Sequence, residues 1–171
     1  MQFQVLRGSV VHADADAIVN AANSHRAHVG GLARAIADSA GPVLIEESAR
    51  FPEVAVGSAV ATGAGDLQAT WVIHAVGPVW SGGRQGEPDL LASAYRSALA
   101  VAAELGARSV AFPSISTGIF GYPLELAAPI AISSVREQWT IQAGQIDRMS
   151  FHLFGEDEFE IFRRCAEERT A

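Results

Sequence analysis

Short apolar runs typical of strands alternate along the chain with segments whose apolar residues recur at helical spacing. This pattern predicts strands that alternate with helices. Short runs rich in β-branched and apolar residues predict strands at 3–6, 17–19, 58–62, 71–76, 109–112 and 149–154. Segments with apolar residues three and four positions apart, mostly bounded by Gly or Pro, predict helices at 30–40, 43–51, 88–105, 123–139 and 156–169. This order predicts an α/β fold in which helices cover both faces of a mostly parallel sheet.

The composition fits one hydrophobic core and excludes several kinds of chemistry. The chain has 171 residues, of which 49% are hydrophobic and 18% charged, so we expect residues 1–171 to form a single domain. Its net charge of −7 makes binding to the phosphate backbone of duplex nucleic acid unfavourable. All 12 basic residues are arginines, so no lysine can act as a nucleophile, a Schiff base or a P-loop residue.

The sequence also indicates a cellular location. Cys165 is the single cysteine, which is compatible with a reducing compartment. The first four residues lack the basic start of a signal peptide, and no apolar run approaches the length of a membrane span. We therefore expect a cytoplasmic protein that does not associate with membranes, and we expect a monomer.

The first candidate binding segment follows the predicted strand at 17–19. Asn20 and Asn23 are the only asparagines in the chain, and Gly30-Gly31 follows at the start of a predicted helix. Free N–H groups at a helix N-terminus, approached closely through glycines, form an anion site. Alternatively, the two asparagines cap local turns and the glycines only cap the helix.

The second candidate segment, Ser116 to Phe120, follows the predicted strand at 109–112. Small residues and glycines leave successive backbone N–H groups free to form a nest for phosphate oxygens. Phe120 could pack on a sugar or a base, or could instead turn into the core of an ordinary tight connection. Two glycine-rich loops that each follow a strand favour a diphosphate held between them.

The histidines do not predict a metal site. His25 and His28 are three residues apart, but no Cys or acidic residue lies near them, so we predict neither a metal nor a cofactor. His74 and His152 lie in apolar strands and are predicted to be core histidines with satisfied hydrogen bonds.

Taken together, these segments resemble a macrodomain. The resemblance covers essentially the whole chain and is carried by residues 16–23, 28–31, 57–67, 74–78 and 112–122. It implies a three-layer α/β/α sandwich around a mixed, mostly parallel sheet. It also implies ADP-ribose and mono-ADP-ribosylated proteins as binding partners, since many members remove mono-ADP-ribose from proteins or deacetylate O-acetyl-ADP-ribose.

The resemblance implies a role for each matched residue. Asp16 would accept the adenine 6-amino group, and the Ala17 N–H would meet a ring nitrogen. Asn23 would hydrogen-bond the distal ribose, with the ring of Phe120 beside it. The two diphosphate loops would consist of Gly30, Gly31, Leu32 and Ala33 and of Ser116, Thr117, Gly118, Ile119 and Phe120.

Three positions depart from the common pattern of the family. Ser9-Val10 stands on the adenine side, where many members have Asp-Ile. Val29 replaces a loop glycine, and Ala33 stands where the best-known hydrolase branch has an Asp. The first loop therefore resembles that of the branch with viral and archaeal macrodomains.

We predict hydrolysis of mono-ADP-ribose from acidic side chains, with the diphosphate of the substrate orienting the attacking water. Asn23, His28 and Phe120 are the predicted catalytic residues, because they are the groups expected beside the reacting ribose. Two alternatives remain open: a non-catalytic ADP-ribose reader, and an O-acetyl-ADP-ribose deacetylase.

Overall fold

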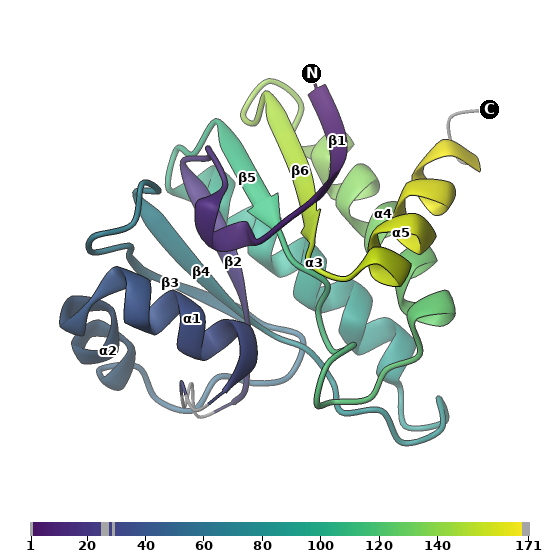
Figure 1. The fold of residues 1–171 in the computed structure, drawn as a ribbon, viewed down its shortest axis with the longest axis horizontal. Helices are drawn as coiled ribbons and strands as arrows, with labels where there is room; N and C mark the ends of the chain where they lie inside the picture. The colour runs from purple at the N-terminus through teal and green to yellow at the C-terminus, as the bar shows by residue number, and fades with distance from the viewer. Residues whose placement is uncertain (1, 25–27, 29, 169–171) are drawn as a thin grey trace.

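A computed structural model describes residues 2–24, 28 and 30–168, and its centre is one six-stranded sheet (Figure 1). The strands are β1 (Gln2–Arg7), β2 (Ala17–Ala22), β3 (Ala59–Gly63), β4 (Trp71–Val76), β5 (Ser109–Phe112) and β6 (Arg148–Leu153). Their order in the sheet is β1-β6-β5-β2-β4-β3. Only the β3–β4 pair is antiparallel, so the predicted mixed and mostly parallel sheet is confirmed.

Helices form a layer on each face of the sheet. They are α1 (Gly31–Ala40), α2 (Pro42–Ala49), α3 (Glu87–Glu104), α4 (Leu124–Ile141) and α5 (Glu156–Glu168), with a short 3-10 helix, η1 (Val10–His12). Successive residues of a strand face opposite sides of the sheet. Accordingly, Ala17 and Val19 of β2 pack in the core with α3, α4 and α5, whereas Ile18 packs in the core with α1, α2 and η1. The predicted α/β/α sandwich is confirmed.

Every predicted strand and helix is present, and the ends differ by at most three residues. The largest difference is in β2, which continues through Ala22 instead of ending before Asn20. Asn20 lies fully buried within the strand, where its Nδ2 is 3.2 Å from Nδ1 of His74 in β4. Nε2 of His74 is in turn 2.9 Å from the hydroxyl of Thr62 in β3. Asn20 therefore does not cap a turn, and the prediction of a satisfied core histidine at position 74 is confirmed.

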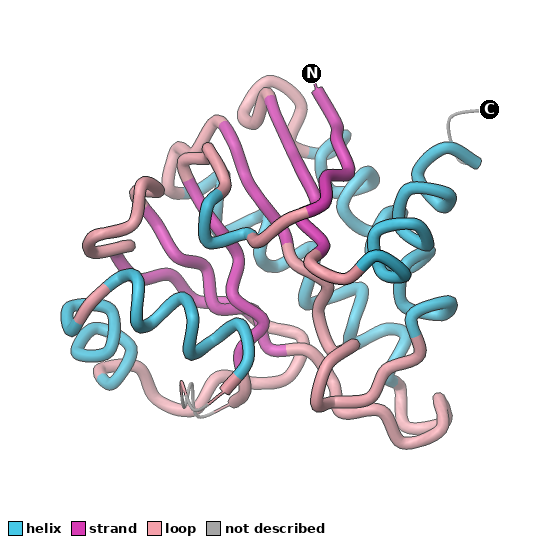
Figure 2. Tube along the Cα trace, viewed as in Figure 1, coloured by secondary structure: helices cyan, strands magenta, loops and turns pink. Residues whose placement is uncertain are grey.

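The chain leaves β2, β4 and β5 at the same edge of the sheet, because these three strands run parallel (Figure 2). In Figure 2 this edge lies at the bottom of the view. Over residues 2–24, 28 and 30–168, no helix is long and apolar enough to cross a membrane.

Candidate functional site

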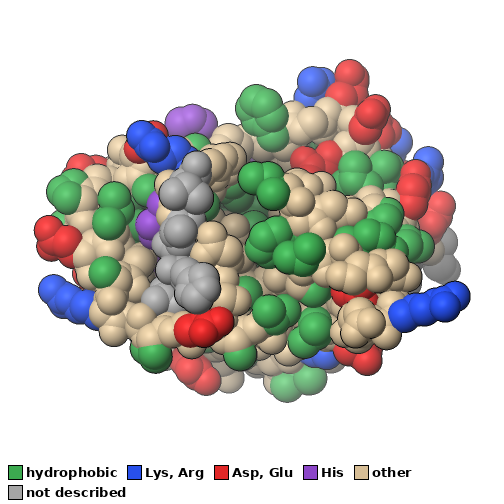
Figure 3. All heavy atoms as spheres, turned by 90° about the horizontal axis from the view of Figure 1, so that it is seen from below, with side chains coloured by type: hydrophobic (Ala, Val, Ile, Leu, Met, Phe, Trp, Pro, Cys, Tyr) green, Lys and Arg blue, Asp and Glu red, His purple; other side chains and the backbone are tan. Residues whose placement is uncertain are grey.

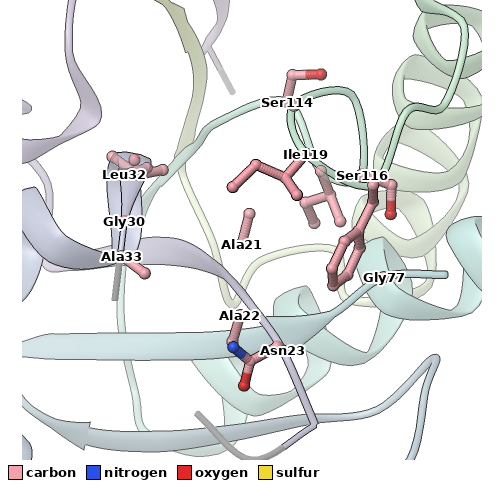
Figure 4. A pocket seen from close by; sticks show the side chains of 14 residues that line it. Ala21, Ala22, Asn23, Gly30, Leu32, Ala33, Gly77, Ser114, Ser116 and Ile119 are labelled. Atoms are coloured by element: carbon pink, nitrogen blue, oxygen red, sulfur yellow. The ribbon is translucent and has the colours of Figure 1, made fainter. Parts of the chain in front are cut away.

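A cavity of about 390 Å³ opens at the carboxyl ends of β2, β4 and β5. Its walls come from four stretches of chain, and the described residues that line it are Ala21, Ala22, Asn23, Gly30, Gly31, Leu32, Ala33, Gly77, Ser114, Ile115, Ser116, Gly118, Ile119 and Phe120. Figure 4 shows Gly30, Leu32 and Ala33 on one side, Ser116 and Gly77 on the other, and Asn23 at the end of β2. The structure therefore brings both glycine-rich loops to one site.

The loop after β5 offers unused backbone donors. In the described part of the chain, no hydrogen bond engages the N–H groups of residues 116–120. The loop is closed from within by two bonds, from Gly121 N–H to the Gly118 carbonyl at 3.0 Å and from Tyr122 N–H to the Ser116 carbonyl at 2.9 Å. Ser116 has φ of 68°, a left-handed conformation that is uncommon outside glycine. Consecutive free N–H groups around such a residue form a concave anion site.

The opposite wall is a helix N-terminus. No side chain caps α1 at Gly30, and Gly31 begins the helix with φ of 52°. The first N–H groups of a helix have no intrahelical partner and carry the positive end of the helix dipole. The cavity is therefore bordered by backbone donors on two sides, without a lysine or an arginine in its described lining.

Two residues that were not predicted as site residues, Tyr95 and Gly77, hold the second loop in place. The hydroxyl of Tyr95 in α3 accepts a hydrogen bond from Ile115 N–H at 2.8 Å. Burial, followed by the charge of Glu158, raises the pKa of Tyr95, so this hydroxyl stays neutral. A Cβ atom at Gly77 would clash with Ser116 Oγ and Ile115 Cγ2, so the close approach of the two loops requires glycine there.

The loop after β4 is organised by a buried carboxylate. Glu87 is 1% exposed and accepts hydrogen bonds from the N–H groups of Ser81, Gly83 and Gln85 at 2.7 to 3.1 Å. Burial by itself raises the pKa of Glu87, but the backbone N–H donors lower it below its ordinary value. Trp80 N–H in this loop donates to the Phe120 carbonyl, so the two loops are joined.

The structure corrects the assignment of Asp16 and Ala17 to an adenine site. The Asp16 carboxylate accepts from Arg108 N–H at 2.8 Å and Ser109 N–H at 2.9 Å, at the amino end of β2. Ala17 is fully buried. The cavity is at the other end of this six-residue strand, a span of roughly 20 Å at about 3.3 Å per residue. Asp16 is a structural residue that joins β2 to β5.

His28 contacts the second helix, α2. Its Nε2 is 3.3 Å from the Ser48 hydroxyl of α2, and its ring centroid lies 5.8 Å from that of His74. It is not one of the described residues that line the cavity. The contact with Ser48 places His28 beside the first loop, and its catalytic role stays a prediction. His25 and Val29, which also entered the predictions, lie outside the described residues.

The predicted adenine-side residues lie after β1, on the same edge of the sheet as the cavity. Ser9 caps η1, with its hydroxyl accepting from Val11 N–H at 3.3 Å, and Val10 is buried. β1 runs beside β6, where Gly8 N–H donates to the Leu153 carbonyl at 2.9 Å. The next residue, Phe154, is 81% exposed and was not among the predicted site residues. Ser9, Val10 and Thr117 are not in the described cavity lining.

The chemistry of the cavity is dominated by backbone groups and neutral side chains. None of its described lining residues carries a titratable side chain. Over the described ranges, no cluster of three or more His, Cys, Asp or Glu residues could hold a metal ion. Seen from this edge, charged side chains lie mainly toward the periphery of the molecule (Figure 3). The site is suited to an anion that is held by N–H groups, with a polar part near Asn23.

Comparison with known proteins shows the family. The model of the Macro domain family matches residues 19–131. A macro domain-containing protein of Caldanaerobacter subterraneus is 42% identical over 98% of this chain and 97% of its own length. An O-acetyl-ADP-ribose deacetylase of Cronobacter sakazakii is 43% identical over 95% of this chain and 92% of its own. The chain belongs to the Macro domain family.

Solved structures agree with this assignment. The Trypanosoma brucei macrodomain in complex with ADP-ribose superimposes with a TM-score of 0.90 at 38% identity, over 96% of this chain and 68% of that one. An Oceanobacillus iheyensis macrodomain gives a TM-score of 0.90 at 30% identity, over 97% and 90% of the two chains.

Proposed function

We propose that the protein binds ADP-ribose in this cavity. The observation that carries the proposal is the pair of donor walls: the loop whose N–H groups at residues 116–120 make no hydrogen bond and the uncapped start of α1 both line the cavity. A diphosphate fits between them, because each wall is an anion site without a charged side chain. The trypanosomal relative with ADP-ribose supports the choice of ligand.

The two ends of the ligand follow from the position of the diphosphate. The distal ribose lies near Asn23, whose amide can both donate to and accept from ribose hydroxyls. Phe120 lines the same cavity and offers its ring to the sugar. The adenine extends along the sheet edge toward Ser9, where the exposed ring of Phe154 offers a stacking face.

We further propose that the protein hydrolyses esters of the distal ribose, in the first place those that link mono-ADP-ribose to acidic side chains. Water adds to the ester carbonyl, the bond from that carbon to the ribose oxygen breaks, and the products are a carboxylic acid and ADP-ribose. Because the described lining contains no titratable group, the water is oriented by the diphosphate of the substrate while Asn23 orients the ribose. Such substrate-assisted hydrolysis is expected to be slow.

O-acetyl-ADP-ribose is the second candidate substrate. The Cronobacter relative, which carries the name of that deacetylase, favours it. Its cleavage is the same ester hydrolysis, with acetate in place of a protein carboxylate. A third possibility, a reader that binds ADP-ribose without cleaving it, makes the opposite prediction for both substrates.

One experiment separates these functions. The protein is incubated with a protein mono-ADP-ribosylated on glutamate and, in parallel, with O-acetyl-ADP-ribose, and the released ADP-ribose is measured by mass spectrometry. We expect release from both substrates. Binding of ADP-ribose without release from either one would leave only the reader function.

A further inference from the structure

The loop at residues 114–117 carries three hydroxyl side chains, and the protein uses only two of them. Ser114 Oγ and Thr117 Oγ1 are 2.6 Å apart, and Thr117 Oγ1 donates to Oε1 of Glu158 in α5 at 3.3 Å. Ser116 Oγ is buried and has no hydrogen-bond partner in the described part of the chain. Two hydroxyls are therefore tied to α5, and the third lies buried against Gly77.

The carboxylate fixes the direction of this chain of hydrogen bonds. An ionised carboxylate accepts hydrogen bonds and has no proton to donate. Thr117 therefore gives its proton to Glu158, and its oxygen receives the proton of Ser114. The Ser114 proton is then used within the loop and is not offered to the cavity that this residue lines. The donors left for an anion are the N–H groups of residues 116–120.

A carboxylate behind an anion-binding loop is unfavourable by its charge alone, because it repels a diphosphate. Its useful contribution is the hydrogen bond that it accepts. That bond reaches the loop from α5, while Tyr95 reaches it from α3 through Ile115 N–H. The segment just before the free N–H groups is thus held from two different helices.

We propose that Glu158 is a positioning residue of the cavity, which through Thr117 and Ser114 keeps residues 116–120 in the conformation that receives a diphosphate. The identity of the anion rests on the proposed function, but the effect on the loop does not. Glu158 touches no part of the ligand in this account and acts only through Thr117.

Paired variants test this proposal. Thr117→Val removes the donor at nearly constant shape, whereas Thr117→Ser keeps it; Glu158→Ala removes the acceptor, whereas Glu158→Gln keeps an acceptor oxygen. Asp157→Asn, at the exposed neighbouring position of the same helical turn, controls for the loss of charge. Calorimetry measures the affinity for ADP-ribose and for adenosine, which lacks the diphosphate.

We expect Thr117→Val and Glu158→Ala to weaken ADP-ribose binding about five- to tenfold, the effect of losing one ordinary hydrogen bond. Thr117→Ser, Glu158→Gln and Asp157→Asn should stay within about twofold of wild type, and adenosine affinity should not change. Wild-type affinity for ADP-ribose in Thr117→Val and Glu158→Ala would overturn the proposal. An equal loss in Thr117→Ser would overturn it as well.

Amide hydrogen exchange, measured without ligand, tests the positioning role of Glu158 independently of ADP-ribose binding. The amides of Ile115, Gly121 and Tyr122 are hydrogen-bonded within or against the loop, so their hydrogen exchange reports its order. A wild-type protein that does not bind ADP-ribose would contradict only the proposed function. In that case faster exchange in Glu158→Ala than in Asp157→Asn supports the positioning role, and equal rates overturn it.

Discussion

The backbone N–H of Trp80 donates to the carbonyl oxygen of Phe120 at 2.8 Å, which joins the loop after β4 to the loop after β5. The rings of Trp80 and Tyr122 strengthen this junction, with centroids 4.6 Å apart. Because both loops form the same wall of the cavity, a change in either one should reach the same ligand.

Glu87→Gln should loosen the loop after β4. The variant loses a charged acceptor of three N–H groups, so its melting temperature should fall by several degrees and ADP-ribose should bind more weakly. The pKa of Glu87 is lowered in the folded state, so its stabilising contribution is present above the unfolded pKa, about 4.3, and is lost as the pH falls through the folded value.

Thermal unfolding between pH 3 and 8 measures this effect. The difference in melting temperature between wild type and Glu87→Gln should be full at pH 6 to 8 and should shrink in acid. Asp89→Asn, an exposed residue in the same first turn of α3, is the matched control. A difference that is constant down to pH 3 would show that the charge of Glu87 is not responsible.

Gly77→Ala should damage the second loop directly. The new methyl group would clash with Ser116 Oγ and Ile115 Cγ2, so the loop must move away from its present position. We expect ADP-ribose affinity to fall at least about tenfold, or 1.4 kcal/mol. Gly63→Ala in β3 is the control, because Gly63 lies outside the cavity lining and a Cβ there meets its nearest atom, Glu47 Oε1, at an ordinary 3.4 Å. Equal affinities of the two variants in calorimetry would place the diphosphate elsewhere.

Asp16→Ala should affect folding and leave binding unchanged. The variant removes the acceptor of Arg108 and Ser109 N–H, a loss of about 1–3 kcal/mol in the free energy of unfolding. Urea denaturation measures that loss, and Asp16→Asn, which keeps one acceptor oxygen, should lose less. A Kd for ADP-ribose that rises tenfold or more in folded Asp16→Ala would restore the adenine role that the structure excludes.

The sequence predicts the fold well where a signal is local. The strands Trp71–Val76 and Ser109–Phe112 match their predicted bounds, because each is an apolar run with polar or glycine-rich ends. Asn20 is polar and was expected to begin a loop; its position inside β2 depends on His74, which is 54 residues away in the sequence. A local pattern cannot contain such a partner.

The same reason explains the errors at the candidate site. Both glycine-rich loops were found because their anion chemistry is encoded in a few adjacent residues. The adenine role was assigned to Asp16 from its position in the family's sequence pattern. That pattern does not show the direction of β2, which places Asp16 at the edge of the sheet opposite the cavity. Glu87 was not singled out, because a glutamate at the start of a helix is ordinary until the loop that it holds is seen around it.

Asn23→Ala should reduce ester hydrolysis more than His28→Ala. Asn23 lines the cavity, so its loss should mis-position the ribose and lower turnover about 100-fold, with a smaller effect on ADP-ribose affinity. His28 contacts Ser48, so His28→Ala should mainly lower stability. Single-turnover rates on the glutamate-linked substrate decide between them. A greater loss of turnover in His28→Ala would mean that the histidine takes part in the reaction.

We propose that ADP-ribose lies between two walls of backbone N–H groups, and amide NMR detects contact with each wall residue by residue. ADP-ribose is titrated into protein labelled with nitrogen-15, and every assigned amide signal is followed. The account predicts saturable shifts with micromolar Kd, about −8 kcal/mol, that are largest at residues 31–33 and 116–120 and negligible at Asp16, Arg108 and Ser109. Unchanged signals at 116–120 at saturating ADP-ribose, or no binding at all, would contradict it.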